Sequence, residues 1–452
     1  MPAWMRLILA GYLLAGSCLG DVYYVATYGN DLLDGSSEGP FRTLARAAKA
    51  ARAGDTVIVR DGIYGHEDAV TGGDFGPDSD NNRSPVKLEN SGNLGAWIAF
   101  RAEHKWGAIL DCEMLCDAYF DLYNSSYIVI QDFVITGGFK EGIHSNDAAH
   151  HVVIRGNRIE NIANRSSASP YGRDGLYTGP NCHDFLIEGN VFHDIGRTDP
   201  SNLDHALYLR GDDFTVVNNI FYNIQRGYAM QLADGLNNIL IANNTFAFPR
   251  PGSDLSGHIM LWRAQNNLTI RNNIFYGQVE VPAAVVRYLS VVNNCTIDHN
   301  LVFGASAVLY TGLLNLGDCA LNANGTGADP QFLDSMRFDF HLMPGSPALD
   351  SAVELPGLIT DFDGVLRPQG AAYDIGAFEF IAPAPDRAVQ DAPRARLGPH
   401  SNGEIRAAGA PLIRPMLFIL SVAAFWLLYK RRLRAGAGLK GAPRKLSAQL
   451  RS

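Results

Sequence analysis

The chain has 452 residues, 47% of them apolar and 18% charged, which is enough apolar material for a large core and too little charge for a disordered protein. The length corresponds to about three domains of roughly 150 residues, although a repeat fold extends as a single domain. The formal charge is −9, but residues 430–452 carry eight Lys or Arg and no acid, and Arg6 is the only charge in residues 1–20. Residues 21–429 therefore carry −18, and this acidity argues against nucleic acid as a partner.

Residues 1–20 have the features of a signal peptide. Arg6 precedes an apolar run from Leu7 to Leu14, and small residues follow the run. This pattern predicts export, with the body of the protein outside the cytoplasm. Cys18 suggests a lipoprotein, but no large aliphatic residue stands three positions before it, which disfavours lipidation.

Five cysteines remain beyond the signal: Cys112, Cys116, Cys182, Cys295 and Cys319. Their count is odd, and the sequence shows neither a CxxC pair nor an accompanying histidine cluster, so no zinc site is expected. Cys112 and Cys116 are either disulfide partners in an oxidising compartment or buried free thiols.

The C-terminal part predicts a linker at residues 381–411, a transmembrane or sorting segment at 412–429 and a basic cytoplasmic tail at 430–452. The apolar run from Met416 to Tyr429 has 14 residues and would cover about 21 Å as a helix, short of a hydrocarbon core of roughly 30 Å unless the residues before it are included. The positive flank predicts a cytoplasmic tail and a body outside. Membrane anchor and processed sorting signal both remain open.

One pattern recurs between residues 126 and 303, namely strand-like residues, a polar residue, an asparagine and then alternating apolar residues. The aligned asparagines are Asn157, Asn190, Asn219, Asn244, Asn273 and Asn300. A period in the twenties with strand-like alternation predicts a parallel β-solenoid, because a single coil cannot bury its own apolar face. The asparagines are expected to hydrogen-bond across coils at about 4.8 Å, with Asp132 as the start of the ladder.

A second strand is expected upstream of each asparagine, and its alternation separates two sets of side chains. The predicted inward set is Ile143, Leu176, Leu207, Met230, Ile259 and Val286. The predicted outward set is His144, Tyr177, Tyr208, Gln231, Met260 and Arg287.

The repeat resembles the right-handed parallel β-helix superfamily that includes pectate-lyase-like proteins. The stretch from Tyr23 to Tyr64 is similar to the N-terminal module of many bacterial members, which implies a strand and an amphipathic helix near residues 41–51 that closes the solenoid. Residues 329–380, with DPQF, MPGSPALD, DFDGVLRP and YDIGAFEF, resemble the choice-of-anchor Q module, which implies surface display.

The expected fold is therefore all-β. It comprises a strand and capping helix at residues 21–54, a right-handed parallel β-helix at 55–328, the C-terminal module at 329–380 and a C-terminal transmembrane or sorting helix.

The usual ligand of this superfamily is a polysaccharide laid along one sheet, but a fold alone does not establish an activity. In β-elimination of an acidic sugar, a base removes the proton α to the carboxylate while a cation neutralises the forming enolate. The candidate catalytic residues are His205, the preferred base, with Arg210, Tyr208, Asp174 and Arg173. The candidate substrate-binding residues are Tyr177, Asp204, Arg226, Gln231, Trp262 and Arg263. Hydrolysis would need two carboxylates, and Asp174 with Asp204 is the candidate pair.

Three acidic motifs have weaker interpretations. Gly211 to Asp213 reads GDD, similar to acidic pairs of polygalacturonase-like hydrolases, but the other motifs of that family are missing and a turn is expected. Asp361 and Asp363 lie in DFDG and are expected in a solvated loop. Calcium is a possible cofactor, and its first candidate ligands are Asp74, Asp78 and Asp80, although EF-hand spacing is absent.

Two classes of function remain. One is a surface enzyme on polysaccharide, more readily a lyase of uronate-containing glycan than a hydrolase. The other is a noncatalytic surface protein that binds glycan or serves as a spacer. The functional groups between residues 173 and 231 favour the first class, whereas the lack of an acid series with a neighbouring lysine, typical of calcium-dependent lyases, favours the second.

Overall fold

The computed structural model describes residues 20–66, 83–145, 148–164, 171–197, 203–225, 227–248, 257–277, 284–287, 291–304, 308–311 and 319–382. The signal, the calcium candidates Asp74, Asp78 and Asp80, and the chain from residue 383 onward lie outside these residues. Among the described residues, none belongs to a helix with both the length and the apolar character needed to span a bilayer.

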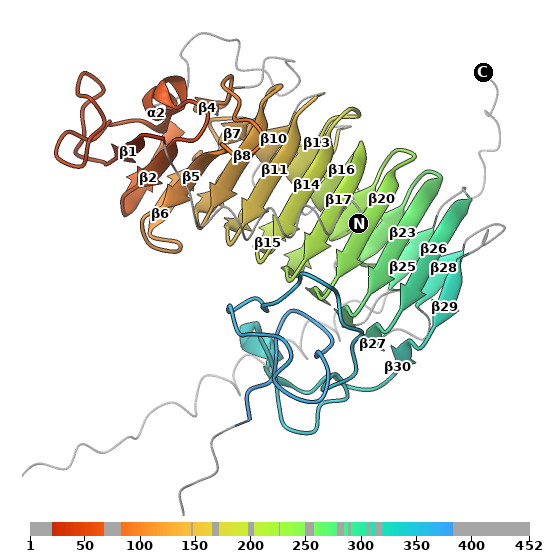
Figure 1. The fold of residues 1–452 in the computed structure, drawn as a ribbon. Helices are drawn as coiled ribbons and strands as arrows, with labels where there is room; N and C mark the ends of the chain where they lie inside the picture. The colour runs from red at the N-terminus through yellow and green to blue at the C-terminus, as the bar shows by residue number, and fades with distance from the viewer. Residues whose placement is uncertain are drawn as a thin grey trace, which may run out of the picture. The chain divides into compact units, whose positions relative to one another are not determined.

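The described strands form three long sheets whose strand pairs are all parallel, and successive coils follow one another from the red β1 to the cyan β30 (Figure 1). Sheet A contains β1 (Val22–Val25), β2 (Thr56–Val59), β5 (Ile98–Ala102), β8 (Ser126–Gln131), β11 (His150–Arg155), β14 (His183–Glu188), β17 (Asp212–Val217), β20 (Asn237–Ala242), β23 (Gln265–Arg271), β26 (Val292–Asp298) and β29 (Ala320–Asn322). Sheet B contains β3 (Gly62–Tyr64), β6 (Ala108–Asp111), β9 (Val134–Thr136), β12 (Arg158–Glu160), β15 (Val191–Ile195), β18 (Ile220–Ile224), β21 (Thr245–Ala247), β24 (Ile274–Tyr276), β27 (Leu301–Phe303) and β30 (Gly325–Thr326). Sheet C contains β4 (Val86–Lys87), β7 (Phe120–Asp121), β10 (Glu141–Ser145), β13 (Asp174–Thr178), β16 (His205–Leu209), β19 (Met230–Leu232), β22 (Ile259–Leu261), β25 (Val285–Arg287) and β28 (Leu309–Thr311). This is the predicted parallel β-helix.

The asparagine ladder lies at the turn from sheet A to sheet B. Asn219 donates from Nδ2 and from its backbone N–H to Oδ1 of Asn244, at 3.0 Å and 2.8 Å, and the same pair of bonds recurs from Asn157 to Asn324. The predicted ladder is confirmed, and Asn324 extends it by one coil. Asp132 is not its start, because the ladder position in that coil holds Phe133, whose N–H donates to Oδ1 of Asn157 at 3.0 Å.

The inward set of sheet C is confirmed except at its last member. Five side chains are completely buried: Ile143, Leu176, Leu207, Met230 and Ile259. Val285, not Val286, pairs with Ile259 and is buried, so the register of β25 is displaced by one residue from the prediction. A displacement of one residue exchanges the two faces of a strand, and the apolar core selects the register observed. Met260 was expected to be exposed but is 2% exposed, so the outward position next to Gln231 is closed to solvent.

The helix predicted near residues 41–51 is shorter. It is α2 (Leu44–Ala50), and the Thr43 side chain caps it by accepting the N–H of Arg46 at 3.1 Å. Leu44 and Ala47 are buried in the same core as the solenoid strands. The preceding strand β1 pairs with β2 and is thus the first strand of sheet A. That α2 closes the open end of the solenoid stays a prediction.

Residues 329–382 pack back along the solenoid (blue in Figure 1). They contain β31 (Phe332–Asp334), the short 3-10 helix η2 (Ser335–Arg337) and β32 (Asp339–Leu342). Phe332 and Phe340 share an apolar cluster with Ile220 and Ile274 of sheet B, and Leu358 packs with apolar side chains on the outer side of sheet A. The segment and the solenoid form one compact unit. Its similarity to choice-of-anchor Q modules remains a prediction.

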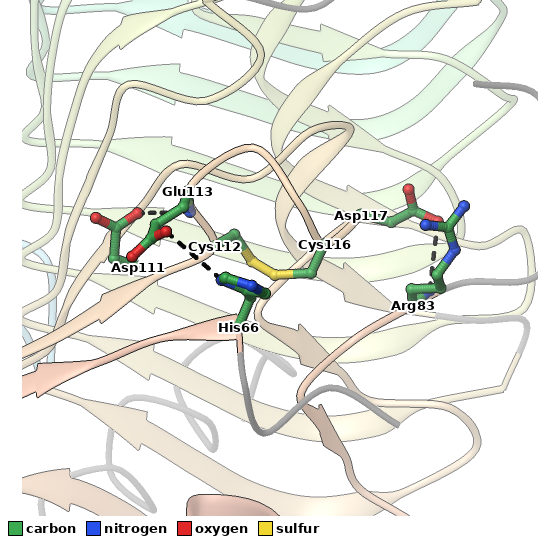
Figure 2. The surroundings of a disulfide bond; sticks show 7 residues. All are labelled: His66, Arg83, Asp111, Cys112, Glu113, Cys116 and Asp117. Carbon is green, nitrogen blue, oxygen red and sulfur yellow. Dashed lines mark hydrogen bonds and ion pairs between the residues drawn. A yellow bond between two sulfur atoms is a disulfide. The ribbon is translucent and has the colours of Figure 1, made fainter. Parts of the chain in front are cut away.

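Two disulfides are present among the described residues, Cys112–Cys116 and Cys295–Cys319, while Cys182 is buried and is in neither of them. The first disulfide lies between His66 and Arg83, the described residues on either side of the segment that contains the calcium candidates (Figure 2). On one side His66 faces Glu113 at 3.7 Å, and on the other the N–H of Arg83 donates to Asp117 at 3.3 Å. Of the two alternatives for Cys112 and Cys116, the structure has the disulfide.

Candidate functional site

Four consecutive strands of sheet C each present one outward side chain, and we call this column the tyrosine face: His144, Tyr177, Tyr208 and Gln231. The ring centroids of His144 and Tyr177 are 5.2 Å apart with an interplanar angle of 8°, and those of Tyr177 and Tyr208 are 5.6 Å apart at 11°. All four side chains are half-buried. The strands thus build a flat aromatic strip that is open to solvent along one side.

Arg210 lies at one edge of the tyrosine face, directly after β16. Its Nη1 donates to Oη of Tyr177 at 3.1 Å, and its Nε donates to Asp234 at 2.6 Å, with 30% of the Arg210 side chain exposed. The backbone N–H of Arg210 donates to Oγ1 of Thr178 at 2.9 Å, which fixes the start of the side chain. A charged group is therefore held against an aromatic strip in a defined position.

Four predicted site residues are buried and do not form part of the exposed face. Arg173 and Asp174 are each 3% exposed, His205 is 1% exposed and Asp204 is completely buried. The prediction that these side chains face solvent is wrong. Asp174 and His205 stand two residues before Leu176 and Leu207, so strand alternation places them on the same inward face, and Arg173 and Asp204 directly precede the two strands. A ligand on the outer face of the sheet therefore does not contact these four side chains directly.

His205 is a neutral acceptor in this environment. Its Nδ1 accepts the backbone N–H of Tyr228 at 3.0 Å, and burial lowers the pKa of His205 to about 4. Its ring stacks between Tyr208 and Tyr228. His205 therefore supports Tyr208 from beneath and does not reach a ligand on the outer face.

The buried carboxylates have structural partners. Asp204 forms a buried ion pair with Arg197 at 2.6 Å and also accepts the N–H of Arg173 at 3.0 Å. Burial raises the pKa of Asp174 well above its usual range, and the neighbouring acids Glu141 and Asp204 raise it further. The candidate hydrolytic pair, Asp174 with Asp204, is thus buried and partly engaged, which disfavours hydrolysis by these two groups.

Arg173 is a buried cation whose donors are incompletely used. Its Nη1 donates to the carbonyl of Gly172 at 3.2 Å, whereas Nε and Nη2 have no hydrogen-bond partner among the residues that the structure describes. Burial lowers its pKa, while the nearby acid Glu141 opposes that effect.

The remaining candidates extend the site along the solenoid. Leu209, Leu232 and Leu261 pair in register, so Arg210 and Trp262 follow the same edge two coils apart. Trp262 is 39% exposed, and Arg263 beside it is exposed as well. Arg226 lies outside the described residues.

Three residues of the site were missed from sequence: Glu141, Arg197 and Asp234. Glu141 could have been found, because it stands directly before GIHS as Asp174 stands before GLYT, and the two residues pair in the sheet. Asp234 follows Arg210 by 24 residues, close to one coil of the repeat, but it lies in a turn and carries no motif.

The other acidic motifs have structural roles. Gly211 occupies the predicted turn with φ of 98°, a conformation in which glycine is favoured, and Asp212 and Asp213 begin β17. Asp361 accepts the N–H groups of Asp363, Val365 and Glu379, so backbone donors occupy both carboxylate oxygens.

A hollow of about 540 Å³ lies at the ends of β6 and β9. Among the residues that the structure describes, its lining includes Asp111, Glu113, Thr136, Asn161 and Asn164 and no Lys or Arg.

Two family models match the chain. Residues 23–180 match the Pel9A-like, right handed beta helix region, and residues 174–331 match the right handed beta helix region. Together with the three parallel sheets, these matches define the chain as a right-handed parallel β-helix protein.

Similar proteins include the uncharacterized protein YwoF of Bacillus subtilis, which is 25% identical over 252 residues. The match covers 49% of each chain, so the chain matches about half the length of that relative. Similar solved structures include pectate lyase Pel9A, with 15% identity, 81% of this chain and 98% of that chain covered and a TM-score of 0.45. An alginate lyase from Paenibacillus has 15% identity, 68% and 99% coverage and a TM-score of 0.41. At this level the similarity carries no inference about activity.

Proposed function

We propose that the protein binds a uronate-containing polysaccharide along the tyrosine face and cleaves it by β-elimination. The observation that carries the proposal is the contact of Arg210 with Tyr177, a cation that donates at 3.1 Å to a phenol on a solvent-open aromatic strip. A sugar ring presents apolar C–H groups that pack on aromatic rings, and a uronate adds a carboxylate that a guanidinium recognises.

Charge limits where such a polymer can bind. The acidic body repels a polyanion at long range, so binding depends on cations close to the contact. Arg210 and Arg263 supply them along one edge of the strip. In the free protein Asp234 partly neutralises Arg210, and the uronate carboxylate would replace or share that partner.

In the proposed reaction Oη of Tyr177, as the phenolate, takes the proton from the carbon α to the uronate carboxylate. The released electron pair forms the new carbon–carbon double bond and the bond to the leaving sugar oxygen breaks. That oxygen takes up the proton from Tyr177, which returns to the phenolate form. Arg210 neutralises the carboxylate while negative charge develops on it. The hydrogen bond from Arg210 favours the phenolate form of Tyr177, although burial, the larger effect, raises the pKa of Tyr177.

A noncatalytic glycan-binding protein is the second candidate. It is favoured by the raised pKa of both Tyr177 and Tyr208, for which burial is the main cause, since a protonated phenol cannot act as a base. The same tyrosine face would then serve recognition alone.

We further propose that the protein acts outside the cytoplasm, at the cell surface. The two disulfides support this location, because disulfides persist in oxidising compartments. The signal-like N-terminus and the cationic tail agree with it.

The test incubates the purified protein with polygalacturonate and with alginate, and measures both ultraviolet absorbance from unsaturated products and binding. Tyr177→Phe should lower turnover about 100-fold or more while it retains binding, and Arg210→Met should weaken both. Tyr276→Phe on sheet B is the matched control and should change neither. Binding without product in the native protein would select the noncatalytic alternative. Absence of both would refute the proposal for these glycans.

A further inference from the structure

Three histidines and an aspartate lie together at the first residues of two neighbouring strands of sheet A. His150 and His151 start β11, and His183 and Asp184 start β14 directly beside them. The rings of His150 and His183 stack with centroids 4.8 Å apart at 3°. One ligand atom from each of His151, His183 and Asp184 lies within 4.8 Å of the others.

The potential ligand atoms are close enough to share one ion. Nδ1 of His183 lies 2.7 Å and Nδ1 of His151 lies 3.7 Å from the same Oδ2 of Asp184, and Nδ1 of His150 lies 2.9 Å from Nδ1 of His151. Ligand atoms of a tetrahedral zinc site, with bonds of about 2.05 Å, are about 3.3 Å apart. The observed distances between the potential ligand atoms, from 2.7 to 3.7 Å, therefore lie on either side of the distance expected in a zinc site.

These residues differ from those at the same positions further along the solenoid. From β20 onward the two positions hold asparagines, whose Nδ2 groups donate to the preceding coil in two ladders: Asn237, Asn266 and Asn293, and Asn238, Asn267 and Asn294. The intervening strand β17 holds Asp212 and Asp213 there. The second position has positive φ throughout, including 52° at His151 and 58° at Asp184, and asparagine is well suited to it. Histidine is not needed for the fold at these positions, so its presence indicates another role.

The surroundings favour a cation and restrain the rings. The charged groups that act on His151 are Asp184, Asp213 and His183, so the fixed charges are negative. Tyr127 stacks on His151 at 4.5 Å and is itself packed against Trp97. The side chains are 30% exposed at His151, 43% at His183 and 23% at Asp184, which leaves a path for an ion from solvent.

We propose that His151, His183 and Asp184 bind one divalent transition-metal ion of the zinc class. Imidazole nitrogens select zinc, cobalt, nickel or copper over calcium and magnesium, which prefer oxygen ligands. His150 is placed to supply a fourth ligand, and Tyr127 holds the ring of His151.

The test titrates the chelator-treated, full-length protein with Zn²⁺ by calorimetry and with Co²⁺ by visible absorption. The expected result is one ion per chain and an absorption band of tetrahedral cobalt that Zn²⁺ removes, while excess Ca²⁺ leaves it unchanged. His151→Asn and His183→Asn should weaken binding about 100-fold or more. Because both variants place in these coils the residue that the later coils already carry, they should fold normally, as circular dichroism will show. Asp184→Asn should also fold normally, for the same reason, and should also weaken binding about 100-fold or more.

His299→Asn is the control, since His299 is also a partly exposed histidine beside a carboxylate, Asp298 at 3.5 Å, and belongs to no group of potential metal ligands among the described residues. It should leave the affinity unchanged. Absence of stoichiometric binding, or an affinity that survives both His151→Asn and His183→Asn, would overturn the proposal.

Discussion

Arg367 of the C-terminal segment donates from Nη2 to Oδ1 of Asn218, which lies on the solenoid 149 residues earlier, at 3.0 Å. The same guanidinium forms an ion pair with Glu379 at 2.7 Å, and both side chains are completely buried. One arginine thus links the turn from sheet A to sheet B with two parts of the C-terminal segment.

We expect Arg367→Met to destabilise the protein by about 3–5 kcal/mol, because it leaves Glu379 as an uncompensated buried charge. Denaturant unfolding followed by circular dichroism measures the change. Arg337→Met is the control, since the Arg337 side chain is 86% exposed and its pair with Asp334 should contribute little. Equal effects of the two substitutions would contradict the assigned role.

Asn244→Ala should cost more than about 2 kcal/mol of unfolding free energy, because Asn244 is completely buried and donates to Val216, Ala242 and Asn273. Asn293→Ala removes an asparagine from an exposed ladder, where water replaces the lost bonds, and should cost under about 1 kcal/mol. Thermal unfolding of both variants provides the comparison. A smaller loss for Asn244→Ala than for Asn293→Ala would rule out burial as the source of the ladder's contribution.

Acid should destabilise the fold through His258. Burial lowers the pKa of His258 from 6.5 to about 3, so between these values the unfolded chain binds a proton that the folded chain does not. Stability from this group is complete above pH 6.5 and falls as the pH is lowered toward 3. His258→Met should flatten that part of the profile of melting temperature against pH, whereas an unchanged acid limb would assign it to other groups.

Base should destabilise the fold through His341. Its hydrogen bond to Asp363, assisted by Asp339, raises the pKa of His341 to about 9. The folded chain therefore holds a proton that the unfolded chain releases, so the stabilisation is complete below pH 6.5 and is lost as the pH rises through about 9. In His341→Asn the melting temperature should lose this alkaline decline. A decline of the native size in that variant would show that His341 is not its source.

Protease added to intact spheroplasts should degrade the body of the protein and spare a tag attached after residue 452, if the proposed orientation is right. The charge of residues 430–452 is the basis of this expectation. A body that survives the protease would place it on the other side of the membrane.

The solenoid could be predicted because its determinants are local and periodic. Each ladder asparagine follows two strand residues and one residue with positive φ, so the recurring sequence pattern predicts the six aligned asparagines. The burial of Asp174 and His205 was also predictable, because they stand two residues before the inward Leu176 and Leu207. The burial of Arg173 and Asp204 was not, because both lie just outside the strands, where alternation does not apply.

The histidine cluster was missed although the signal was present. His150 precedes Asn157 by seven residues, and His183 precedes Asn190 by seven residues, so the alignment already placed them in one column. In a parallel solenoid, any column of titratable residues is a spatial cluster.

From β8 onward the coils differ in length most at the connection from sheet B to sheet C, while the connection from sheet C to sheet A varies from two residues between β16 and β17 to eight between β28 and β29. Over the same range the connection from sheet A to sheet B has two residues in every coil, whereas the connection from sheet B to sheet C ranges from four residues between β9 and β10 to thirteen between β12 and β13. These variable connections lead directly into the strands of the tyrosine face. Insertions and deletions in these connections can change the surface beside the tyrosine face without moving the asparagines of the ladder. Ligand preference in such a protein is therefore free to diverge while the frame that carries it stays constant.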